Sequence, residues 1–523
     1  MSRLAIPLTM LLAAFAIAQQ AINPATECFD PRPEWAKFTP PWEPHAIKDE
    51  PMIGITPPTL AVGEETVAEM GDGAPVDGGR WVNDKPITLA ARQSVEPALV
   101  VLPDGRMFVA VEDHGDHDGW ISIQQSIDGG ETWTWRISFR TGTESRNPAI
   151  SFASRLDQEY LFLTYEASVS SDIKQVVLIR IDPRDLTWHP VTIEANIVAT
   201  ADIHPRICTD DALYEAYYVY VVYAVNAIDY HAIMFARSTD AGDTFSTPTN
   251  ITGGSEVTAF VPQPDIAFGT GGLFVAFEKP GWSGSTWINQ VWVTRSGNFG
   301  SAWSEPQQLT ALTLGASRPA VAAAVGAPTV MVAYTRPYST DSDIQFAYSA
   351  DSGATWFMNR WLPWTAANEK SVALGVTHNG GRFHAAWWRD YDIVYTSAAI
   401  TTPATWASTM IINEENLVSS TYARPSLCSD STQTVAEEAC LTWTDMREGA
   451  YRVYFDAGFR HIGDMNCDGF VTVGDIGGFV LALTNPTEYA ATYPGCDIMN
   501  GDVDGNGFVT VGDIGAFVAL LTS

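Results

Sequence analysis

Residues 126–133 read Ser126-Ile127-Asp128-Gly129-Gly130-Glu131-Thr132-Trp133, and this stretch decides the fold of the chain. The same pattern, Ser-x-Asp-x-Gly-x-Thr-aromatic, returns at residues 238–245 and 349–356, and a degenerate copy occupies residues 296–303. The Asp side chain of each copy can accept backbone N–H groups of a turn, and the Gly can adopt a positive φ angle. Each copy therefore predicts a tight turn between two strands, against which the final aromatic residue packs.

The turn motif belongs to a longer repeat that opens with a proline. A Pro-x-apolar marker begins a short apolar run at Pro97, Pro148, Pro205, Pro264, Pro319 and Pro425. Successive markers are 51, 57, 59, 55 and 106 residues apart. Because the last interval is about twice the others, one copy lacks its proline, and Ser371-Val372-Ala373 fits the gap. The chain therefore contains seven copies of one unit.

Each copy has the pattern of four short strands. In the second copy we expect strands at residues 149–152, 160–165, 175–181 and 188–193. Four-stranded repeats of this length are typical of β-propeller blades, which bury their faces only against neighbouring blades. The seventh copy has room for three strands, so we expect residues 87–91 to supply its fourth and close the ring. The pattern predicts a mainly β fold, a seven-bladed propeller over residues 86–460, with six blades as the alternative.

The turn motif is similar to the Asp-box, or BNR repeat, of the sialidase superfamily of β-propellers, and the resemblance covers residues 87–460. It implies that the Asp-boxes are structural and lie on the face away from the active site, so their aspartates receive no catalytic role. The Arg-Ile-Pro motif of the family is replaced here by Val95-Glu96-Pro97. Members of the family have six blades rather than seven.

Propeller ligand sites lie at the channel mouth, where first strands begin and second strands end. The chain has only 29 Lys and Arg residues, yet many arginines fall at these positions. First-strand starts contribute Glu96, Arg146, His204, Arg206, Gln263, Arg318 and Arg424, and second-strand ends contribute Glu112, Asp113, Tyr165, Glu166, Glu278, Arg336, Arg389, Asp390, Asp445 and Arg447. Guanidinium groups bind carboxylates through two parallel hydrogen bonds, so this enrichment indicates a site for an anion or a sugar acid.

The resemblance implies the catalytic candidates of a sialidase, an exo-acting glycoside hydrolase. They are Arg206, Arg318 and Arg424 as an arginine triad, Asp113 as the acid, and Tyr165 or Tyr334 as the nucleophile. The alternative is that the arginines form salt bridges from blade to blade around the channel. Fold alone does not imply function, so two hypotheses follow. The first is a hydrolase of sialic-acid or related glycosidic bonds in polysaccharide catabolism, and the second is a non-catalytic propeller that binds carbohydrate or protein.

The N-terminus has the pattern of a secretory signal peptide, over residues 1–18. Arg3 supplies a positive charge, residues 4–15 are apolar, and Ala16-Ile17-Ala18 forms a cleavage site. We expect a secreted protein, extracellular or attached to the cell surface, with no membrane span after cleavage. Residues 19–85 are rich in Pro, Gly and acidic residues without a period, so we expect an irregular N-terminal segment.

The net charge argues against two classes of partner. The chain has 61 acidic and 29 basic residues, a net charge of −32, and only 17% charged residues in all. A surface this negative repels nucleic acid and anionic membranes. We therefore expect neither as a partner, and an extracellular glycan instead.

The C-terminal residues contain a second repeat, with an offset of 38 between residues 463–475 and 501–513. Calcium requires six or more oxygen ligands, which an EF-type loop provides from positions 1, 3, 5, 7, 9 and 12, with Gly at position 6. The first loop offers Asp464, Asn466, Asp468, Thr472 and Asp475 with the Phe470 carbonyl, and the second offers Asp502, Asp504, Asn506, Thr510 and Asp513 with the Phe508 carbonyl. The repeat therefore predicts an EF-hand-like site for two calcium ions.

One short helix is expected after each loop and none before it, since apolar residues follow at helical spacing. This arrangement resembles a type I dockerin, and the stretch 489–496 is similar to the dockerin-like tails of secreted planctomycete proteins. The resemblance implies an all-α dockerin-like domain over residues 461–523 and a cohesin partner on a scaffold or cell surface. The alternative is a calcium-stabilised cap or stalk. The module has eight acidic residues and no Lys or Arg, so we expect it to fold only with metal.

Six cysteines in an exported protein allow disulfides. The preferred pairs are Cys428–Cys440 and Cys467–Cys496, because each lies within one small unit. Buried thiols are the alternative.

Overall fold

The computed structural model describes most of the chain from residue 84 onward. The described residues are 59–66, 84–130, 132–155, 158–199, 201–210, 218–227, 230–252, 263–311, 315–338, 341–363, 365–377, 381–407, 409–429, 439–458, 463–466, 471–493, 496, 498–501, 503 and 509–521. The expected signal peptide lies outside them, as do Asp468, Phe470, Asp502, Asp504, Asn506 and Phe508 of the expected calcium loops.

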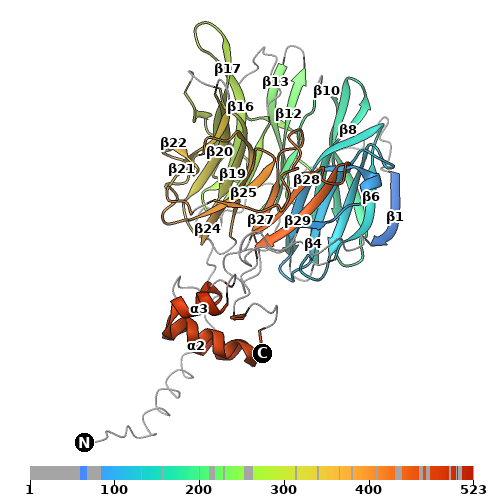
Figure 1. Cartoon of the computed structure of the whole chain (residues 1–523). Coiled ribbons are helices and arrows are strands. Elements are labelled where there is room, and N and C mark those ends of the chain that lie inside the picture. The colour runs from blue at the N-terminus through green and yellow to red at the C-terminus, as the bar shows by residue number, and fades with distance from the viewer. Residues whose placement is uncertain are drawn as a thin grey trace, which may run out of the picture. The chain divides into compact units, whose positions relative to one another are not determined.

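Most of the described residues form seven antiparallel sheets (Figure 1). From the inner strand outward, the first three are β3 (Ser94–Val101), β4 (Met107–Asp113), β5 (Trp120–Ser126) and β6 (Thr134–Arg140); β7 (Glu144–Arg155), β8 (Gln158–Ser170), β9 (Ile173–Ile181) and β10 (Trp188–Val198); and β11 (Arg206–Thr209), β12 (Val219–Ala227), β13 (Tyr230–Ser238) and β14 (Thr249–Asn250). The next three are β15 (Asp265–Gly269), β16 (Gly272–Trp282), β17 (Trp287–Ser296) and β18 (Gln307–Gln308); β19 (Ser317–Ala323), β20 (Val330–Pro337), β21 (Ser342–Ser349) and β22 (Phe357–Trp361); and β23 (Glu369–Val376), β24 (Arg382–Arg389), β25 (Asp392–Ala399) and β26 (Met410–Ile411). The seventh holds β27 (Ser426–Ser429), β28 (Ala439–Asp445), β29 (Arg452–Gly458) and β2 (Lys85–Pro86).

The inner strands lie side by side in a closed ring. Strand β3 contacts β7, β7 contacts β11, and the series continues through β15, β19, β23 and β27. Strands β27 and β28 then contact β3. The protein is therefore a seven-bladed β-propeller, as the repeat predicts, and the six-bladed alternative is wrong. Blade 6 is the copy without a proline, since Ser371 lies in its inner strand β23.

The ring is closed by residues that precede blade 1 in the sequence. Strand β2 pairs with β29, with Lys85 opposite Phe455. The Ile87 N–H then donates to the Val453 carbonyl at 2.9 Å, and the Thr88 hydroxyl accepts the Val453 N–H at 3.0 Å. The predicted closure is therefore present, but the strand lies two residues earlier than expected. The pairing with β29 ends at Thr88, because the Val453 N–H donates to the Thr88 hydroxyl instead of to a backbone carbonyl. Residues 90–92 then form a 3₁₀ turn.

One strand lies where the sequence predicts irregular structure. Strand β1 (Thr59–Thr66) pairs with β6 and gives blade 1 a fifth, outermost strand. The expectation for residues 19–85 is wrong at this point. Apolar and polar residues do not alternate along this strand. Its register with β6 shifts between Val62 and Glu65, where Gly63 and Glu64 form a bulge or irregularity.

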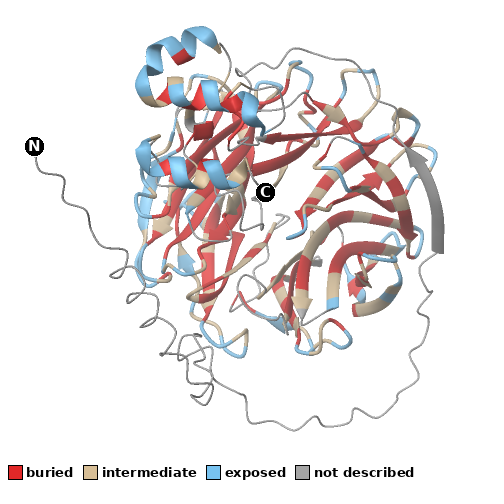
Figure 2. Cartoon of the chain, turned by 90° about the horizontal axis from the view of Figure 1, so that it is seen from below, coloured by how far each residue is buried: buried red, intermediate tan, exposed pale blue. Residues whose placement is uncertain are grey.

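A separate cluster of buried side chains lies between each pair of neighbouring blades. Phe108 and Phe139 of blade 1 pack with Leu163 of blade 2, for example, and the same arrangement recurs around the ring. Figure 2 shows these buried residues along the strands. Because blades are covered on both faces, every residue of β4 is buried and a simple inside–outside alternation is absent.

The Asp-box turns have the geometry that their sequence predicts. In blade 1 the Asp128 Oδ1 accepts the Thr132 N–H at 2.9 Å, and the Ser126 Oγ accepts the Gly130 N–H at 2.9 Å. The closing Trp133 is 2% exposed and packs on Phe455 of blade 7, with ring centroids 5.1 Å apart. The turns around Asp240 and Asp351 repeat these hydrogen bonds, and the degenerate copy repeats them with Asn298.

The C-terminal module contains helices α2 (Ile476–Thr484), α3 (Pro486–Thr492) and α4 (Ile514–Leu520), and 3₁₀ turns at Val473–Asp475, Ile498–Gly501 and Val511–Asp513. Phe479 and Phe517 occupy equivalent positions of the repeat and stack with centroids 4.0 Å apart. Helix α3 is not expected from the loop repeat alone. No described helix is long and apolar enough to cross a membrane.

The structure corrects one of the two predicted disulfides. Cys428 and Cys440 stand opposite each other on β27 and β28, yet both retain thiols. They belong to the apolar cluster between blades 7 and 1, where cysteine acts as a small apolar side chain. Cys496 is disulfide-bonded, and its partner lies outside the described residues.

Candidate functional site

Strand register separates the two faces of the propeller. In blade 1, Ser94 pairs with Asp113 and Asp113 with Trp120 at one end of the blade. At the other end, Met107 pairs with Ser126, the first residue of the Asp-box. First-strand starts and second-strand ends therefore share one face, which we call the mouth face. The Asp-boxes lie on the opposite face.

The residues at the first-strand starts have an unusual backbone. Glu96, Asn147, His204 and Arg318 each precede a proline and have positive φ angles of 49°, 54°, 43° and 53°. Ser371, at the same place in the blade without proline, has a φ of 61°. Residues other than glycine rarely adopt this conformation, and a following proline favours extended backbone instead. A strained residue therefore recurs around the channel, and such strain persists only where the surroundings fix it.

Side chains at the second-strand ends fix these strained residues. The Glu112 Oε2 of blade 1 accepts the Asn147 N–H of blade 2 at 2.9 Å. In the same way Glu166 accepts the N–H groups of Ile203 at 2.6 Å and His204 at 3.2 Å. The Glu278 carboxylate accepts the Arg318 N–H, and the Thr335 hydroxyl accepts that of Ser371 at 3.0 Å. Each contact joins one blade to the next.

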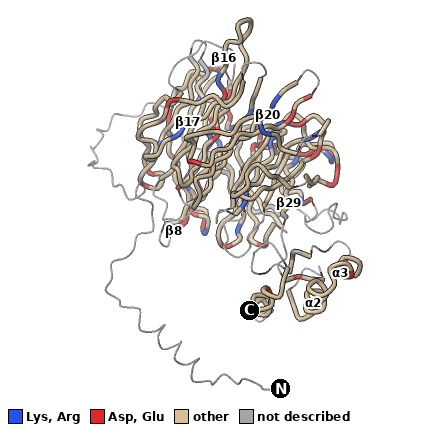
Figure 3. Tube along the Cα trace, turned by 90° about the vertical axis from the view of Figure 1, so that its left-hand side faces the viewer, with Lys and Arg blue, Asp and Glu red and all other residues tan. Residues whose placement is uncertain are grey.

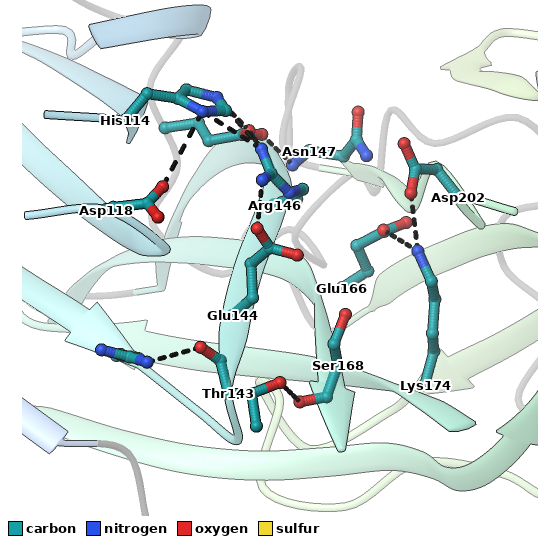
Figure 4. A network of polar contacts seen from close by, with 12 residues as sticks. His114, Asp118, Thr143, Glu144, Arg146, Asn147, Glu166, Ser168, Lys174 and Asp202 are labelled. Atoms are coloured by element: carbon teal, nitrogen blue, oxygen red, sulfur yellow. Dashed lines mark hydrogen bonds and ion pairs between the residues drawn. The ribbon is translucent and has the colours of Figure 1, made fainter. Parts of the chain in front are cut away.

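These clamping carboxylates are shielded from solvent. Burial raises the pKa of Glu278 to about 7, against the opposing effect of its hydrogen bond from the Arg318 N–H. Burial also raises the pKa of Glu166, while Lys174 opposes that rise. Lys174 donates to both Glu166 and Asp202 at 2.6 Å, as Figure 4 shows. We interpret these glutamates as structural groups rather than ligand contacts.

Three arginines from alternate blades lie near Glu96 on the mouth face. Arg206 begins β11 of blade 3, Arg318 lies in β19 of blade 5, and Arg424 precedes β27 of blade 7. Burial and the Glu112 carboxylate raise the pKa of Glu96, and all three guanidinium groups oppose that rise. The three groups are therefore near enough to Glu96 to affect its pKa, and their assignment as a ligand-binding triad stays a prediction.

A second carboxylate completes this cluster. The Arg424 Nη2 lies 3.4 Å from the Asp265 Oδ2, which belongs to β15 of blade 4. Blades 4 and 7 are not neighbours, so the pair spans the channel. Burial and repulsion by Arg424 lower the pKa of Arg206 to about 10. Arg424 therefore pairs with a carboxylate across the channel, whereas Arg146 of blade 2 pairs with Glu112 of the neighbouring blade 1.

Hydrogen-bonding capacity remains on the arginines. Arg318 donates to the Ser371 hydroxyl, and Arg206 donates to the Pro205 carbonyl at 2.9 Å. The Arg424 Nη1 is buried and makes no hydrogen bond to any described residue. A guanidinium group carries five N–H donors, so these contacts leave donors for an anion in the channel.

The other predicted catalytic residues lie inside the blades. Asp113 is fully buried and accepts hydrogen bonds from Ser94, at 2.6 Å, and from Ser122 of its own blade. Tyr165 is fully buried, its hydroxyl 2.8 Å from the Thr141 hydroxyl. Tyr334 is also fully buried, and burial raises its pKa to about 12. Their burial counts against direct contact with a ligand in the channel, and their roles as acid and nucleophile stay predictions.

A different set of ionisable side chains lines the mouth beside blades 1 and 2. Arg146 binds Glu112 and Glu144, and the His114 Nε2 lies 2.6 Å from the Glu112 Oε1 (Figure 4). The Tyr422 ring lies 5.9 Å from the His114 ring, measured between centroids. Burial and Glu112 raise the pKa of Tyr422. Neither His114 nor Tyr422 belongs to one of the sequence repeats.

The C-terminal module can be tested for calcium only at its described ligands. Asp464, Asp475 and Asp513 are fully buried carboxylates, and such groups require compensating positive partners. Asp475 accepts the N–H groups of Met465 at 2.7 Å and Thr472 at 2.8 Å, so its oxygens already organise the loop. Asp513 accepts the Thr510 N–H at 2.8 Å in the same way. Among the described residues no group of three or more His, Cys, Asp or Glu side chains could hold a metal ion, so the two calcium sites stay a prediction.

The repeat also duplicates an exposed apolar surface. Val473 and Val511 are 75% and 77% exposed, and they occupy equivalent positions. The pairs Ile476 with Ile514 and Val480 with Val518 continue the surface along α2 and α4. Figure 3 shows no Lys or Arg along α2 or α3. Exposed apolar side chains of this kind are candidates for contact with a partner.

No family model matches the chain, and no curated protein matches it. Among solved structures, an ulvan lyase of polysaccharide lyase family PL25, bound to a saccharide, has a TM-score of 0.48 and 10% identity over 71% of this chain and 95% of that chain. A Hadza microbial sialidase has a TM-score of 0.39 and 12% identity, covering 72% and 94%. A fucose-binding lectin of Aleuria aurantia has a TM-score of 0.37 and 11% identity, covering 63% and 97%. At these TM-scores the likenesses carry no inference about activity.

Proposed function

We propose that the protein binds an anionic extracellular glycan at the channel mouth, with a carboxylate of the glycan held by Arg206, Arg318 and Arg424. Two observations support the proposal: the Arg424–Asp265 ion pair spans the channel, and all three guanidinium groups lower the pKa of Glu96. A hydrogen bond to a charged group contributes about 1.5–3 kcal/mol, and the guanidinium group matches the geometry of a carboxylate. In a protein with a net charge of −32, a cluster of arginines is a site for a specific anion rather than a general basic surface.

The experiment that tests this proposal is a glycan array probed with the purified chain. Matched sialylated, uronate-containing, sulfated and neutral glycans are compared for wild type, Arg206→Gln and Arg184→Gln. Arg184 is the control because its exposed side chain pairs with Asp182 near the opposite face. The proposal requires carboxylated glycans to be selected over neutral ones and the selection to be lost in Arg206→Gln alone. Equal binding of neutral glycans would contradict it.

Hydrolysis of sialic-acid linkages is less well supported than binding. The proposed acid and nucleophile, Asp113, Tyr165 and Tyr334, are buried away from the arginines' channel. Absence of sialic-acid release from sialyllactose, together with binding on the array, is the expected result.

The arrangement of His114, Arg146 and Tyr422 supports a second candidate function, cleavage of a uronate-containing chain by elimination. Arg146 would neutralise the carboxylate, His114 would remove the proton on the adjacent carbon, and Tyr422 would protonate the departing oxygen. The glycosidic C–O bond breaks as a carbon–carbon double bond forms, so no water is consumed. Ultraviolet absorbance of the unsaturated product tests this candidate, and loss of that signal in His114→Ala would support it.

We further propose that the protein is exported and attached through its C-terminal module. Two calcium ions in the loops at residues 464–475 and 502–513 would organise the module, and the duplicated apolar surface would bind a cohesin-like partner on a scaffold or cell surface. Circular dichroism of the full chain with and without chelator tests the calcium requirement. Loss of helical signal on chelation, restored by calcium, is expected, and an unchanged spectrum would contradict it.

A further inference from the structure

Large aromatic side chains are exposed on the mouth face of blades 4 and 5. Trp282 and Trp287 are 52% and 44% exposed, and Tyr338 and Trp361 are 37% and 42% exposed. We call these four side chains the aromatic patch. Water-exposed tryptophans are uncommon, and a group of them marks a surface that meets a ligand or partner.

The first two residues stand on a hairpin that rises above the channel mouth. Strands β16 and β17 pair from Glu278 opposite Val291 to Trp282 opposite Trp287, four residues beyond the clamping Glu278. At a rise of 3.3 Å per residue the tip lies about 13 Å beyond that level. Figure 1 shows this hairpin extending past the ends of the neighbouring strands. The two indole rings meet edge to face, with centroids 5.5 Å apart.

The other two residues form a second exposed pair beside this hairpin. The rings of Tyr338, which follows β20, and Trp361, at the end of β22, lie 6.1 Å apart at an angle of 22°. Gly315 lies between the two pairs. A Cβ atom added to this glycine would be 3.3 Å from the Pro337 Cγ and 3.9 Å from the Ile288 Cγ2. Pro337 and Ile288 are each next in sequence to a member of the patch. Both aromatic pairs therefore border one region of the mouth face.

We infer that the aromatic patch is a second contact surface for the glycan held by the arginines, on which uncharged sugar rings of the same chain stack. The inference rests on the proposed function. Sugar rings present flat C–H faces that suit the faces of Trp and Tyr, whereas an acidic sugar unit is suited to the arginines. The hairpin tip adds the hydroxyl groups of Ser283, Ser285 and Thr286, which can bind sugar hydroxyls. The ligand is therefore a polymer of several sugar units rather than a single terminal sugar.

Chain-length dependence of binding tests this inference. Disaccharides and octasaccharides of three polymers in which uronate and uncharged sugar units alternate, hyaluronan, unsulfated chondroitin and heparosan, are titrated into the full-length chain. For at least one polymer the octasaccharide binds wild type about tenfold more tightly than the disaccharide does. Trp282→Ala and Trp361→Ala lose that gain and keep the affinity for the disaccharide, while Trp282→Phe retains most of the gain.

Control variants separate this inference from its alternatives. Ile127→Ala removes an apolar side chain that is 74% exposed on the opposite face, and it leaves both affinities unchanged. Arg206→Gln weakens binding at both lengths. Binding without a length gain, or a gain that survives in Trp282→Ala and Trp361→Ala, overturns the aromatic patch as a glycan surface and leaves the arginine site standing. Absence of all binding overturns both proposals, and a change only in oligomeric state would assign the patch to self-association.

Discussion

The two faces of the propeller use the same residue type in opposite ways. On the Asp-box face, Arg180, Arg237 and Arg295 end the third strands of blades 2, 3 and 4, and each donates to a carbonyl in the Asp-box turn of the next motif-bearing blade. The acceptors are the carbonyls of Ala241, at 3.0 Å, Phe299, at 2.5 Å, and Ser352. On the mouth face, Arg206, Arg318 and Arg424 instead all lower the pKa of Glu96. The same residue type therefore ties neighbouring blades together on one face, and on the other face we propose that it binds an anion.

The blades are joined at both faces, but by different chemistry. On the mouth face a buried carboxylate or hydroxyl accepts the N–H group of a strained residue in the next blade, as Glu278 does for Arg318. On the Asp-box face the carboxylate of Asp128 closes its own turn and remains largely exposed. A buried contact should therefore contribute more to stability than an exposed one.

The largest expected effect is on the mouth face, in Glu278→Ala. The substitution leaves the Arg318 N–H and the Asn289 side chain without their acceptor, and it should lower the free energy of unfolding by about 2–4 kcal/mol. Thermal or urea unfolding measures the change. The exposed Glu305→Ala is the matched control, with no expected loss. Equal stability of the two variants would contradict the clamping role of Glu278.

A smaller effect is expected on the Asp-box face, in Asp128→Ala. Loss of the hydrogen bonds to the Thr132 N–H and hydroxyl should lower the free energy of unfolding by about 1 kcal/mol. Asp128→Asn should retain most of the stability, because Asn298 already closes the degenerate turn by accepting the Ala302 N–H at 2.8 Å. Glycan affinity should be unchanged in both variants. A loss of affinity would place the Asp-box in the site.

The smallest expected effect is an increase in affinity, in Glu96→Gln. The ionised Glu96 carboxylate competes with the ligand for the three arginines, and its pKa is raised. Wild type should therefore bind more weakly as pH rises through the pKa of Glu96. The variant should bind about threefold more tightly at mildly basic pH and lose that dependence. Titration calorimetry at several pH values measures it, and weaker binding by the variant would instead assign Glu96 to ligand contact.

The sequence repeats predict the seven blades correctly, because the size of a blade sets the spacing of the repeat. The proline interval located the seven blades, and its doubled last value pointed to Ser371-Val372-Ala373 as the copy without proline. In the structure Ser371 has the same positive φ as the residues that precede the prolines. Strand positions also gave the arginine triad, which stays a prediction. The sequence distinguishes poorly between adjacent residues at a strand end. Side chains alternate between the two faces of a strand, so an error of one residue assigns a side chain to the wrong face. Glu112 clamps the next blade, whereas its neighbour Asp113 is bonded within its own blade.

Other features depend on contacts that the sequence does not display. Strand β1 exists because β6 offers an open edge, and the pattern of residues 59–66 carries little sign of it. Cys428 and Cys440 are within one small unit, but the apolar packing between blades 7 and 1 determines their thiol state. Helix α3 does carry a sequence signal, because Asn485 is its N-cap and Pro486 takes the first helical position.

We expect the mouth arginines, and not the arginines of the opposite face, to bind an anionic glycan. Calorimetric titration of the carboxylated glycan selected on the array into wild type, Arg424→Gln and Arg237→Gln tests this. Arg424→Gln is expected to lose about a hundredfold in affinity without unfolding, and Arg237→Gln is expected to bind as wild type does. Equal affinity of Arg424→Gln and wild type, or an equal loss in both variants, would contradict it.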